Sequence, residues 1–264
     1  MSGFISIERV GDPRLAEFRL NERGLASRTD RRDDAGAGLF LAEGDLVVER
    51  ALEAGCLPYR ALADADRPTA VAQRLRDAGV DVFVGGDEVR RLVTGLGMPH
   101  PIVALFHRPR RPSAAALVAD VERLVVIEGV DNPANVGSVV RNAAALGWDG
   151  LLLDHTSADP LARRALRVAM GTAFSLPHAR TASLSSVLAD ARGLTLLALT
   201  PGEHAEDIRD VRVDGRRAVL IGSERAGLSA ELLDLARPVR IPMAGGVDSL
   251  NAAAAAAVAC YALA

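Results

Sequence analysis

The second half of the chain alternates strongly apolar runs with helix-like segments, and this alternation constrains the fold more than any other feature. The runs RLVVIEGV, DGLLLD, LTLLALT, RAVLIGS and ARPVRIPM are almost continuously apolar, and segments such as NVGSVVRNAAALG and LARRALRVAM between them have helical periodicity. A strand that is apolar on both faces must be buried on both faces, as in a parallel sheet covered by helices. We therefore predict an α/β fold with a parallel C-terminal sheet.

The first half of the chain predicts a smaller α/β domain. LFLAEGDLVVERALEAG is typical of a strand that runs into an amphipathic helix, and PTAVAQRLRDAG of a second helix. VDVFVG and PIVALFHR predict strands, with a helix over GGDEVRRLVTG between them. The proline- and arginine-rich stretch FHRPRRPSAAA is typical of a linker. We expect a first domain over residues 1–107, a linker over 108–120 and a second domain over 121–264.

Composition limits the kinds of function to consider. The chain has 264 residues, 49% of them hydrophobic, which is enough for a packed core. The net charge of −3 and the aromatic content of 3% argue against a protein that coats nucleic acid or stacks bases, so any RNA contact must be local. Cys56 and Cys260 are too far apart for metal-ligand spacing, and no disulfide framework is possible. We expect no metal, no signal peptide, no membrane span and a reduced cytoplasmic setting.

Three polar loops follow apolar runs: EGVDNPANVGSVVRNAAALG, LIGSERAGLS and RIPMAGGVDSLNAAAAAA. In a parallel sheet these loops meet at the carboxyl edge, where ligands bind. We expect Asn135 to cap a helix, while Arg141 fits either a ligand contact or a solvated surface. Glu224 fits a loop brace or a first helical turn, and Ser249 fits a ligand contact or an N-cap. The loops lack the phosphate-loop and dinucleotide fingerprints, which excludes those two site types.

Taken together, the three loops resemble a known family. N-x(5)-R from Asn135 to Arg141, G-S-E-x-x-G from Gly222 to Gly227, and I-P-M-x(5)-S-L-N from Ile241 to Asn251 resemble the three ordered motifs of the SpoU/TrmH branch of the SPOUT RNA methyltransferases. The resemblance covers residues 121–264. The preceding domain is similar in size and pattern to the ribosomal-protein-like RNA-binding domain that many members carry.

The resemblance implies a fold and an activity. The C-terminal segment would form a trefoil knot, S-adenosylmethionine would bind in it, and two copies would form a homodimer. The reaction would be methylation of a ribose 2′-hydroxyl in RNA. The alanine-rich end, VDSLNAAAAAAVACYALA, then has a physical reason, because a thin alanine helix can pass through a loop and pack closely against its neighbours.

The resemblance also implies roles for individual residues. Arg141 would lie at the ribose, Asn135, Ser249 and Asn251 would arrange it and the hydroxyl, and Glu224 would brace the second loop. Because guanidinium is almost never neutral in proteins, we favour Arg141 as a clamp for developing negative charge rather than a general base, and the path of the proton stays open. The residues expected to bind the cofactor are Thr200, Gly222, Ser223, Ile241, Met243, Ser249 and Leu250. Arg167 would be a phosphate contact. Apart from the resemblance, an arginine-rich stretch predicts either an RNA-binding patch or a solvated helix and loop, since Asp30, Asp33 and Asp34 lie nearby; its residues are Arg14, Arg19, Arg23, Arg28, Arg31 and Arg32.

The substrate class is less constrained than the chemistry. Family members that act on transfer RNA are often short, so the resemblance, with a leading domain of about a hundred residues, implies a large structured RNA such as 23S ribosomal RNA, in either a housekeeping or an antibiotic-resistance role. A transfer RNA 2′-O-methyltransferase is one alternative, and a catalytically inactive RNA-binding assembly factor is another. The intact Asn135, Arg141, Ser249 and Asn251 argue against the inactive factor.

Overall fold

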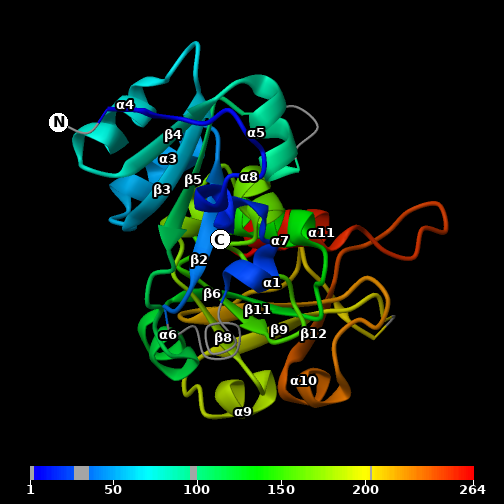
Figure 1. Ribbon diagram of the computed structural model, residues 1–264. Helices are drawn as coiled ribbons and strands as arrows, with labels where there is room; N and C mark the ends of the chain where they lie inside the picture. The colour runs from blue at the N-terminus through cyan, green and yellow to red at the C-terminus, as the bar shows by residue number, and fades with distance from the viewer. Residues whose placement is uncertain (1–2, 27–35, 96–99, 203) are drawn as a thin grey trace. The chain divides into compact units, whose positions relative to one another are not determined.

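The computed structural model describes residues 3–26, 36–95, 100–202 and 204–264 (Figure 1). The chain divides into two compact units, each with its own sheet. The first unit contains the described residues up to 110 together with Leu161–Phe174, and the second contains Arg111–Pro160 and Ser175–Ala264. Of the expected RNA contacts, Arg28, Arg31 and Arg32 lie outside the described residues.

The first unit is built on a mixed five-stranded sheet with the order β1-β4-β3-β5-β2. Strand β5 runs antiparallel to both of its neighbours, and the other pairs are parallel. The strands and helices predicted from the apolar runs are confirmed. Strand β3 was missed, because its apolar core is only Ala61–Ala63 and a bulge between Pro58 and Arg60 interrupts its pairing. The elements are β1 (Ile5–Ser6), η1 (Pro13–Leu15), η2 (Glu17–Arg19), α1 (Glu22–Leu25), β2 (Leu39–Glu43), α3 (Asp45–Glu53), β3 (Pro58–Asp64), α4 (Ala70–Asp77), β4 (Asp81–Gly85), α5 (Asp87–Thr94) and β5 (Ile102–His107).

The second unit is built on a seven-stranded sheet with the order β10-β12-β9-β11-β6-β7-β8. Every pair in it is parallel, which confirms the predicted sheet type. The central strands are buried on both faces, as their apolar runs require. Two short strands, β8 and β10, carry too few apolar residues to have been predicted. The strands are β6 (Arg123–Glu128), β7 (Gly150–Asp154), β8 (His178–Thr181), β9 (Thr195–Leu199), β10 (Glu206–Asp207), β11 (Arg217–Gly222) and β12 (Arg237–Arg240).

Helices cover both faces of this second sheet (Figure 1). Helices α6 (Ala114–Asp120), α9 (Leu184–Ala189) and α10 (Ala230–Leu235) share one apolar cluster with the sheet. Helices α7 (Pro133–Ala145) and α11 (Ala252–Ala262) pack on the other face and against each other. Helix α6 lies inside the stretch 108–120 that the sequence suggests as a linker, and its side chains belong to this core.

Two side-chain hydrogen bonds fasten the alanine-rich terminal helix. Asn142 donates to the carbonyl oxygen of Ala253 at 3.1 Å, and the Trp148 indole donates to that of Cys260 at 3.0 Å. The small side chains of α11 allow this close approach to α7. Cys260 is fully buried, and burial raises the pKa of its thiol to about 12, so it is an inert part of the packing.

A segment from the middle of the chain completes the first unit. Helix α8 (Arg163–Ala169) and η3 (Thr172–Phe174) are flanked in sequence by the second unit, yet they pack in the first. The ring of Phe174 lies 5.5 Å from that of Phe40, and Arg50 donates a hydrogen bond to the carbonyl oxygen of Met170. The sequence predicts this helix but places it in the domain 121–264. We call Leu161–Phe174 the inserted segment.

A buried carboxylate holds the inserted segment in place. Glu43, at the end of β2, is 4% exposed and forms ion pairs with Arg163, with Arg167 at 3.8 Å and with His100 at 3.8 Å. Burial raises the pKa of Glu43, although the surrounding cations act to lower it. The ionised carboxylate therefore depends on its arginine partners for compensation.

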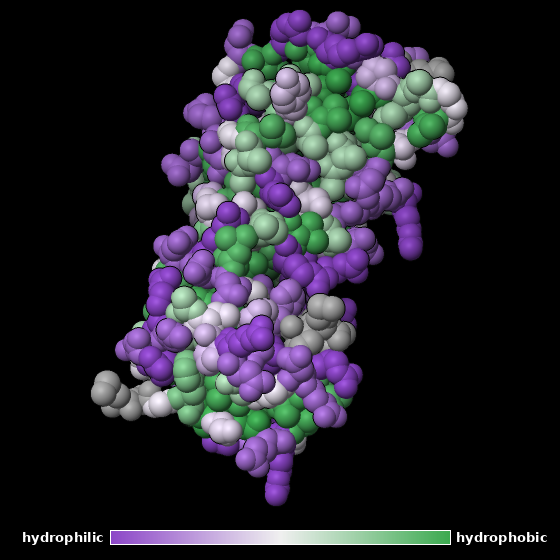
Figure 2. All heavy atoms as spheres, turned by 90° about the horizontal axis from the view of Figure 1, so that it is seen from above, coloured by the Kyte–Doolittle hydropathy of each residue, from purple (hydrophilic) through white to green (hydrophobic). Residues whose placement is uncertain are grey.

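The helices that the structure describes are short. No helix among the described residues is long and apolar enough to cross a bilayer. The face drawn in Figure 2 is largely hydrophilic, with smaller hydrophobic patches between the polar side chains. Within the same described residues, no group of three or more His, Cys, Asp or Glu side chains could hold a metal ion.

Replacing the arginine that faces Glu43 tests the role of the inserted segment. We expect Arg163→Ala to lower the free energy of unfolding by about 2–4 kcal/mol, because a buried charge loses its nearest partner. Arg164→Ala, at the exposed neighbouring position, is the control and should have little effect. The double change Glu43→Gln with Arg163→Met should recover most of the loss, as measured by urea unfolding.

The loss of stability in Arg163→Ala should depend on pH, because the pKa of Glu43 is raised. Protonation removes the buried charge, and in the folded unit it begins above the ordinary value of 4.5. The difference between Arg163→Ala and the wild type should therefore narrow as the pH falls toward 4.5. A constant difference across that range would mean that the Glu43 charge is not the cause.

Candidate active site

The carboxyl ends of β6, β7 and β11 lie at one edge of the second sheet, because these strands are parallel and in register. Gly222 at the end of β11 pairs with Glu128 at the end of β6. The first motif follows β6, the second follows β11, and the third follows β12 of the same parallel sheet. This is the edge at which parallel α/β sheets bind ligands.

The loop after β6 is braced by Asp154, at the end of β7. Its carboxylate accepts hydrogen bonds from the Gly129 amide at 3.0 Å and from the amide of Thr156 at 3.1 Å. Burial acts to raise the pKa of Asp154, but these bonds and those of the Ser157 and Thr156 hydroxyls hold it below its ordinary value. The carboxylate therefore stays ionised and fixes the start of the first motif. The sequence reading missed it, although an acid directly after an apolar run was the available signal.

The second motif folds into a tight turn after β11. Ser223 and Gly227 form an isolated β-bridge, and the Ser223 hydroxyl accepts from the Ala226 amide at 3.2 Å. A Cβ at Gly222 would lie 2.1 Å from the carbonyl carbon of Gly227, so only glycine fits beneath the turn. The turn is therefore held close to the sheet by its own backbone.

A second carboxylate anchors the far side of that turn. Glu128 accepts a hydrogen bond from the Ser229 amide at 2.7 Å, just before α10 begins at Ala230. Glu224 lies in the turn itself and not in a helix, which decides between its two sequence interpretations. The role of Glu128 was not predicted, because the pairing of β6 with β11 cannot be seen in the sequence.

The expectation that Asn135 caps α7 is wrong. Asn132 is the N-cap, and its side chain accepts from the Ala134 amide at 3.0 Å. Asn135 lies within the first turn of the helix, so its side chain is available for other partners. Its amide nitrogen donates to Glu224, and its oxygen accepts from the Asn251 amide nitrogen at 3.1 Å.

Asn251 connects this pair to the terminal helix. Its side-chain oxygen accepts from the Ala253 amide at 2.9 Å, so Asn251, and not Ser249, is the N-cap of α11. The three motifs are thus joined by one chain of hydrogen bonds that runs from Glu224 through Asn135 to Asn251. We call it the amide chain.

A cavity of about 410 Å³ opens beside the amide chain. This volume lies within the range of about 300–1,000 Å³ that small-molecule sites occupy. Apolar side chains from β11, α10 and the third motif line it, together with the polar turn. All seven residues expected to bind the cofactor are among those that line it: Thr200, Gly222, Ser223, Ile241, Met243, Ser249 and Leu250.

The expected catalytic arginine lies elsewhere on α7. Arg141 is exposed and is not among the residues that line the cavity. Arg167 belongs to the inserted segment of the first unit. Of the expected RNA contacts, Arg14 pairs with Asp12 at 2.7 Å, and Arg19 donates to the Asp12 carbonyl oxygen at 2.7 Å. The remaining described residue of that set, Arg23, is exposed on α1.

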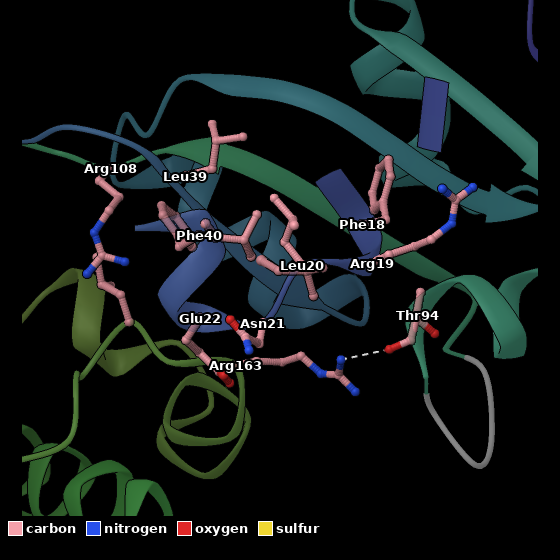
Figure 3. Close-up of a pocket in the computed structure, with 13 residues that line it drawn as sticks. Phe18, Arg19, Leu20, Asn21, Glu22, Leu39, Phe40, Thr94, Arg108 and Arg163 are labelled. Atoms are coloured by element: carbon pink, nitrogen blue, oxygen red, sulfur yellow. Dashed lines mark hydrogen bonds between the residues drawn. The ribbon is translucent and has the colours of Figure 1, made fainter. Parts of the chain in front are cut away.

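The first unit has a smaller hollow of about 190 Å³ (Figure 3). Arg19, Arg108 and Arg163 line it with Phe18 and Phe40. Its volume is below the range of about 300–1,000 Å³ for small-molecule sites. Arg163 donates to the Thr94 carbonyl oxygen at 2.8 Å, so this cation braces the fold. The cavity of about 410 Å³ beside the amide chain is the better candidate for a cofactor.

Comparison with known proteins identifies the family of the chain. The model of the SpoU rRNA Methylase family matches residues 122–261. An uncharacterized tRNA/rRNA methyltransferase of Mycobacterium bovis is 39% identical, over 95% of this chain and 88% of that protein. The 23S rRNA (uridine(2479)-2′-O)-methyltransferase of Streptomyces viridochromogenes is 31% identical, over 94% and 89%. A crystal structure of an AdoMet-bound rRNA methyltransferase from Sinorhizobium meliloti superposes with a TM-score of 0.81 at 26% identity, covering 97% of this chain and 96% of that one.

Adding a methyl group at Gly222 tests whether the turn must lie this close to the sheet. We expect Gly222→Ala to lower the free energy of unfolding by about 1–3 kcal/mol, because the turn must move away from the sheet. The same movement should weaken S-adenosylmethionine binding, as measured by titration calorimetry. Gly202→Ala is the control, since the nearest atom to its Cβ would be 3.8 Å away. Unchanged affinity and stability in Gly222→Ala would contradict the close packing at this turn.

Proposed function

We propose that this chain, which belongs to the SpoU rRNA methylase family, transfers the methyl group of S-adenosylmethionine to a ribose 2′-hydroxyl of 23S ribosomal RNA. The observation that carries the proposal is the amide chain beside the cavity, since it joins the three motif loops into one site. The match over nearly the whole length of a relative named for 23S rRNA supports the ribosomal substrate.

The cavity has the features that S-adenosylmethionine requires. Ile221, Ile241 and Leu250 offer apolar surface for the adenine, and the backbone of the Gly222 turn offers polar groups. When bound, the cofactor supplies an electrophilic methyl group. Because that group is already reactive, much of the rate can come from holding the RNA hydroxyl in line with it.

The amide chain is suited to that positioning. In Asn135 the amide nitrogen and oxygen are both engaged, so neighbouring groups fix its orientation. Asn251 is fixed in the same way between Asn135 and the helix amide of Ala253. Ser249, which is exposed and lines the cavity, carries a hydroxyl that can contact the incoming sugar.

We assign Arg141 to the RNA side of the reaction. A guanidinium stays protonated, so it serves as a clamp on a phosphate or on the developing alkoxide rather than as a proton acceptor. Its exposed position on α7 leaves it accessible to a large ligand. In this proposal the proton of the ribose 2′-hydroxyl passes to water or to an RNA phosphate.

We also propose a homodimer through the exposed faces of α7 and α11. Tyr261 is 77% exposed and Val258 is 38% exposed, and both lie on the outer face of the terminal helix. An apolar face with an aromatic residue is suited to association with a second copy. Since α7 packs against α11, a contact there would form close to the helix that carries Arg141.

Three further parts of the proposal concern the whole protein. The first unit would bind RNA through Arg14, Arg19, Arg23 and the Arg167 of its inserted segment.

The trefoil knot implied by the resemblance remains a prediction for the segment that leads into α11. A cytoplasmic location fits an RNA substrate and two free buried thiols.

Labelled S-adenosylmethionine and separated RNA pools test the substrate. The protein should label 23S ribosomal RNA at one ribose, and mapping should find a 2′-O-methyl group there. Labelling of transfer RNA alone would establish the alternative suggested by the tRNA/rRNA naming of the Mycobacterium bovis relative. Cofactor binding with no labelling of any RNA would indicate an inactive assembly factor.

The role of Arg141 can be separated from cofactor binding. We expect Arg141→Ala to reduce methyl transfer by about 100-fold or more, because a preorganised charge contact to the transition state is lost. Its affinity for S-adenosylmethionine should stay near the wild-type value, since Arg141 does not line the cavity. Arg192→Ala, an exposed arginine before β9, is the control. Wild-type turnover in Arg141→Ala would remove this assignment.

The proposed dimer face gives a separate prediction. Tyr261→Asp should shift the protein from dimer to monomer in sedimentation measurements, because a charge would be buried at the contact. Tyr261→Phe keeps the ring and should remain dimeric. A Tyr261→Asp protein that sediments as the wild type does would place the interface elsewhere.

A further inference from the structure

Among the described residues, three charged side chains line the cavity of about 410 Å³ beside the amide chain: Glu224, Arg225 and Asp248. Glu224 already accepts a hydrogen bond from Asn135. Among the described lining residues, Arg225 is the one cation, and Glu224 and Asp248 are the two acids. No salt bridge of the described residues involves Arg225.

The backbone holds Arg225 in a fixed place. It lies in the middle of the tight turn, between the bridged residues Ser223 and Gly227. The Gly227 amide donates to the Ser223 carbonyl oxygen at 3.0 Å, and the Ala226 amide donates to the Ser223 hydroxyl at 3.2 Å. The side chain of Arg225 is exposed and lines the cavity, so the fixed backbone of the turn presents a cation to a ligand that binds there.

These charges complement those of the methyl donor. S-adenosylmethionine has one carboxylate and two cationic groups, the ammonium and the sulfonium. The cavity wall carries two acids and one arginine, so its charges are opposite in sign and equal in number to those of the donor. Glu224 and Asp248 would repel the donor carboxylate, whereas a guanidinium can bind it with two parallel hydrogen bonds.

We propose that Arg225 binds the carboxylate of S-adenosylmethionine, and so distinguishes the intact amino acid end of the donor from shorter adenosyl compounds. This inference rests on the proposed function, because it assumes that the donor occupies the cavity. It assigns Arg225 to cofactor recognition and not to the RNA, although both ligands carry anionic groups.

The comparison of two ligands isolates this contact. Titration calorimetry would measure the affinities of wild-type protein and Arg225→Ala for S-adenosylmethionine and for its decarboxylated analogue. We expect the wild type to prefer the intact donor by about three- to tenfold, since the ion pair is charge-assisted but partly exposed. The preference should fall to about onefold in Arg225→Ala, with little change in affinity for the analogue.

Two further variants serve as controls. Arg225→Lys keeps the charge but loses the two-pronged geometry, and should retain part of the preference. Arg192→Ala removes an exposed arginine before β9, at the opposite edge of the sheet, and should keep the whole preference.

The outcomes separate the inference from the proposed function. An unchanged preference in Arg225→Ala would overturn the inference while leaving the methyl donor site intact. Loss of RNA affinity in that variant, with donor affinity unchanged, would reassign Arg225 to the RNA and also overturn it. If the wild-type protein binds neither donor nor analogue, the proposed function itself fails.

Discussion

The hydrogen bonds between β6 and β11 determine the position of every later feature of the second unit. This parallel pairing places Gly222 beside Glu128, although 93 residues separate them in the sequence. It brings the loops of the first two motifs to one edge, where Glu128 accepts from the Ser229 amide and Glu224 accepts from Asn135. The third motif then joins through Asn251. A change of register by one residue would move the side chains of β11 to the opposite faces of the sheet and separate these partners.

The resulting site combines neutral amide groups with the carboxylates of Asp154, Glu128 and Glu224, all of them held by hydrogen bonds. Two asparagine amides, a tight glycine turn and two helix N-caps supply most of its geometry. Fixed amides and hydroxyls cost little reorganisation when a ligand arrives, which suits a reaction whose methyl donor is already reactive. Arg141 and Arg225, to which we assign RNA and cofactor contacts in the proposal, are both exposed.

The first unit shows a different dependence on long-range contacts. Its sheet carries a buried carboxylate, Glu43, whose partners Arg163 and Arg167 come from a segment that follows β7 of the second unit in sequence. The two units are therefore not successive stretches of chain. Since the ionised Glu43 depends on those arginines for compensation, residues that the chain reaches more than a hundred positions later stabilise the first unit.

The sequence by itself determined the α/β class, the parallel C-terminal sheet and most of its strands and helices, because strands that are buried on both faces consist of consecutive apolar residues. It also identified the three motif loops, since short polar turns after buried strands are local features, and the resemblance of those loops to a family indicated the seven cavity residues. Only the tertiary structure decided that Asn132 caps α7, that Asn251 caps α11, and that Asn135 bridges Glu224 and Asn251. The same holds for the braces Glu128 and Asp154 and for the place of the inserted segment. The two caps are local choices between polar residues close together in sequence. The bridge, the braces and the inserted segment depend on which strands become neighbours, and strand order is a property of long-range packing that no local pattern of residues specifies.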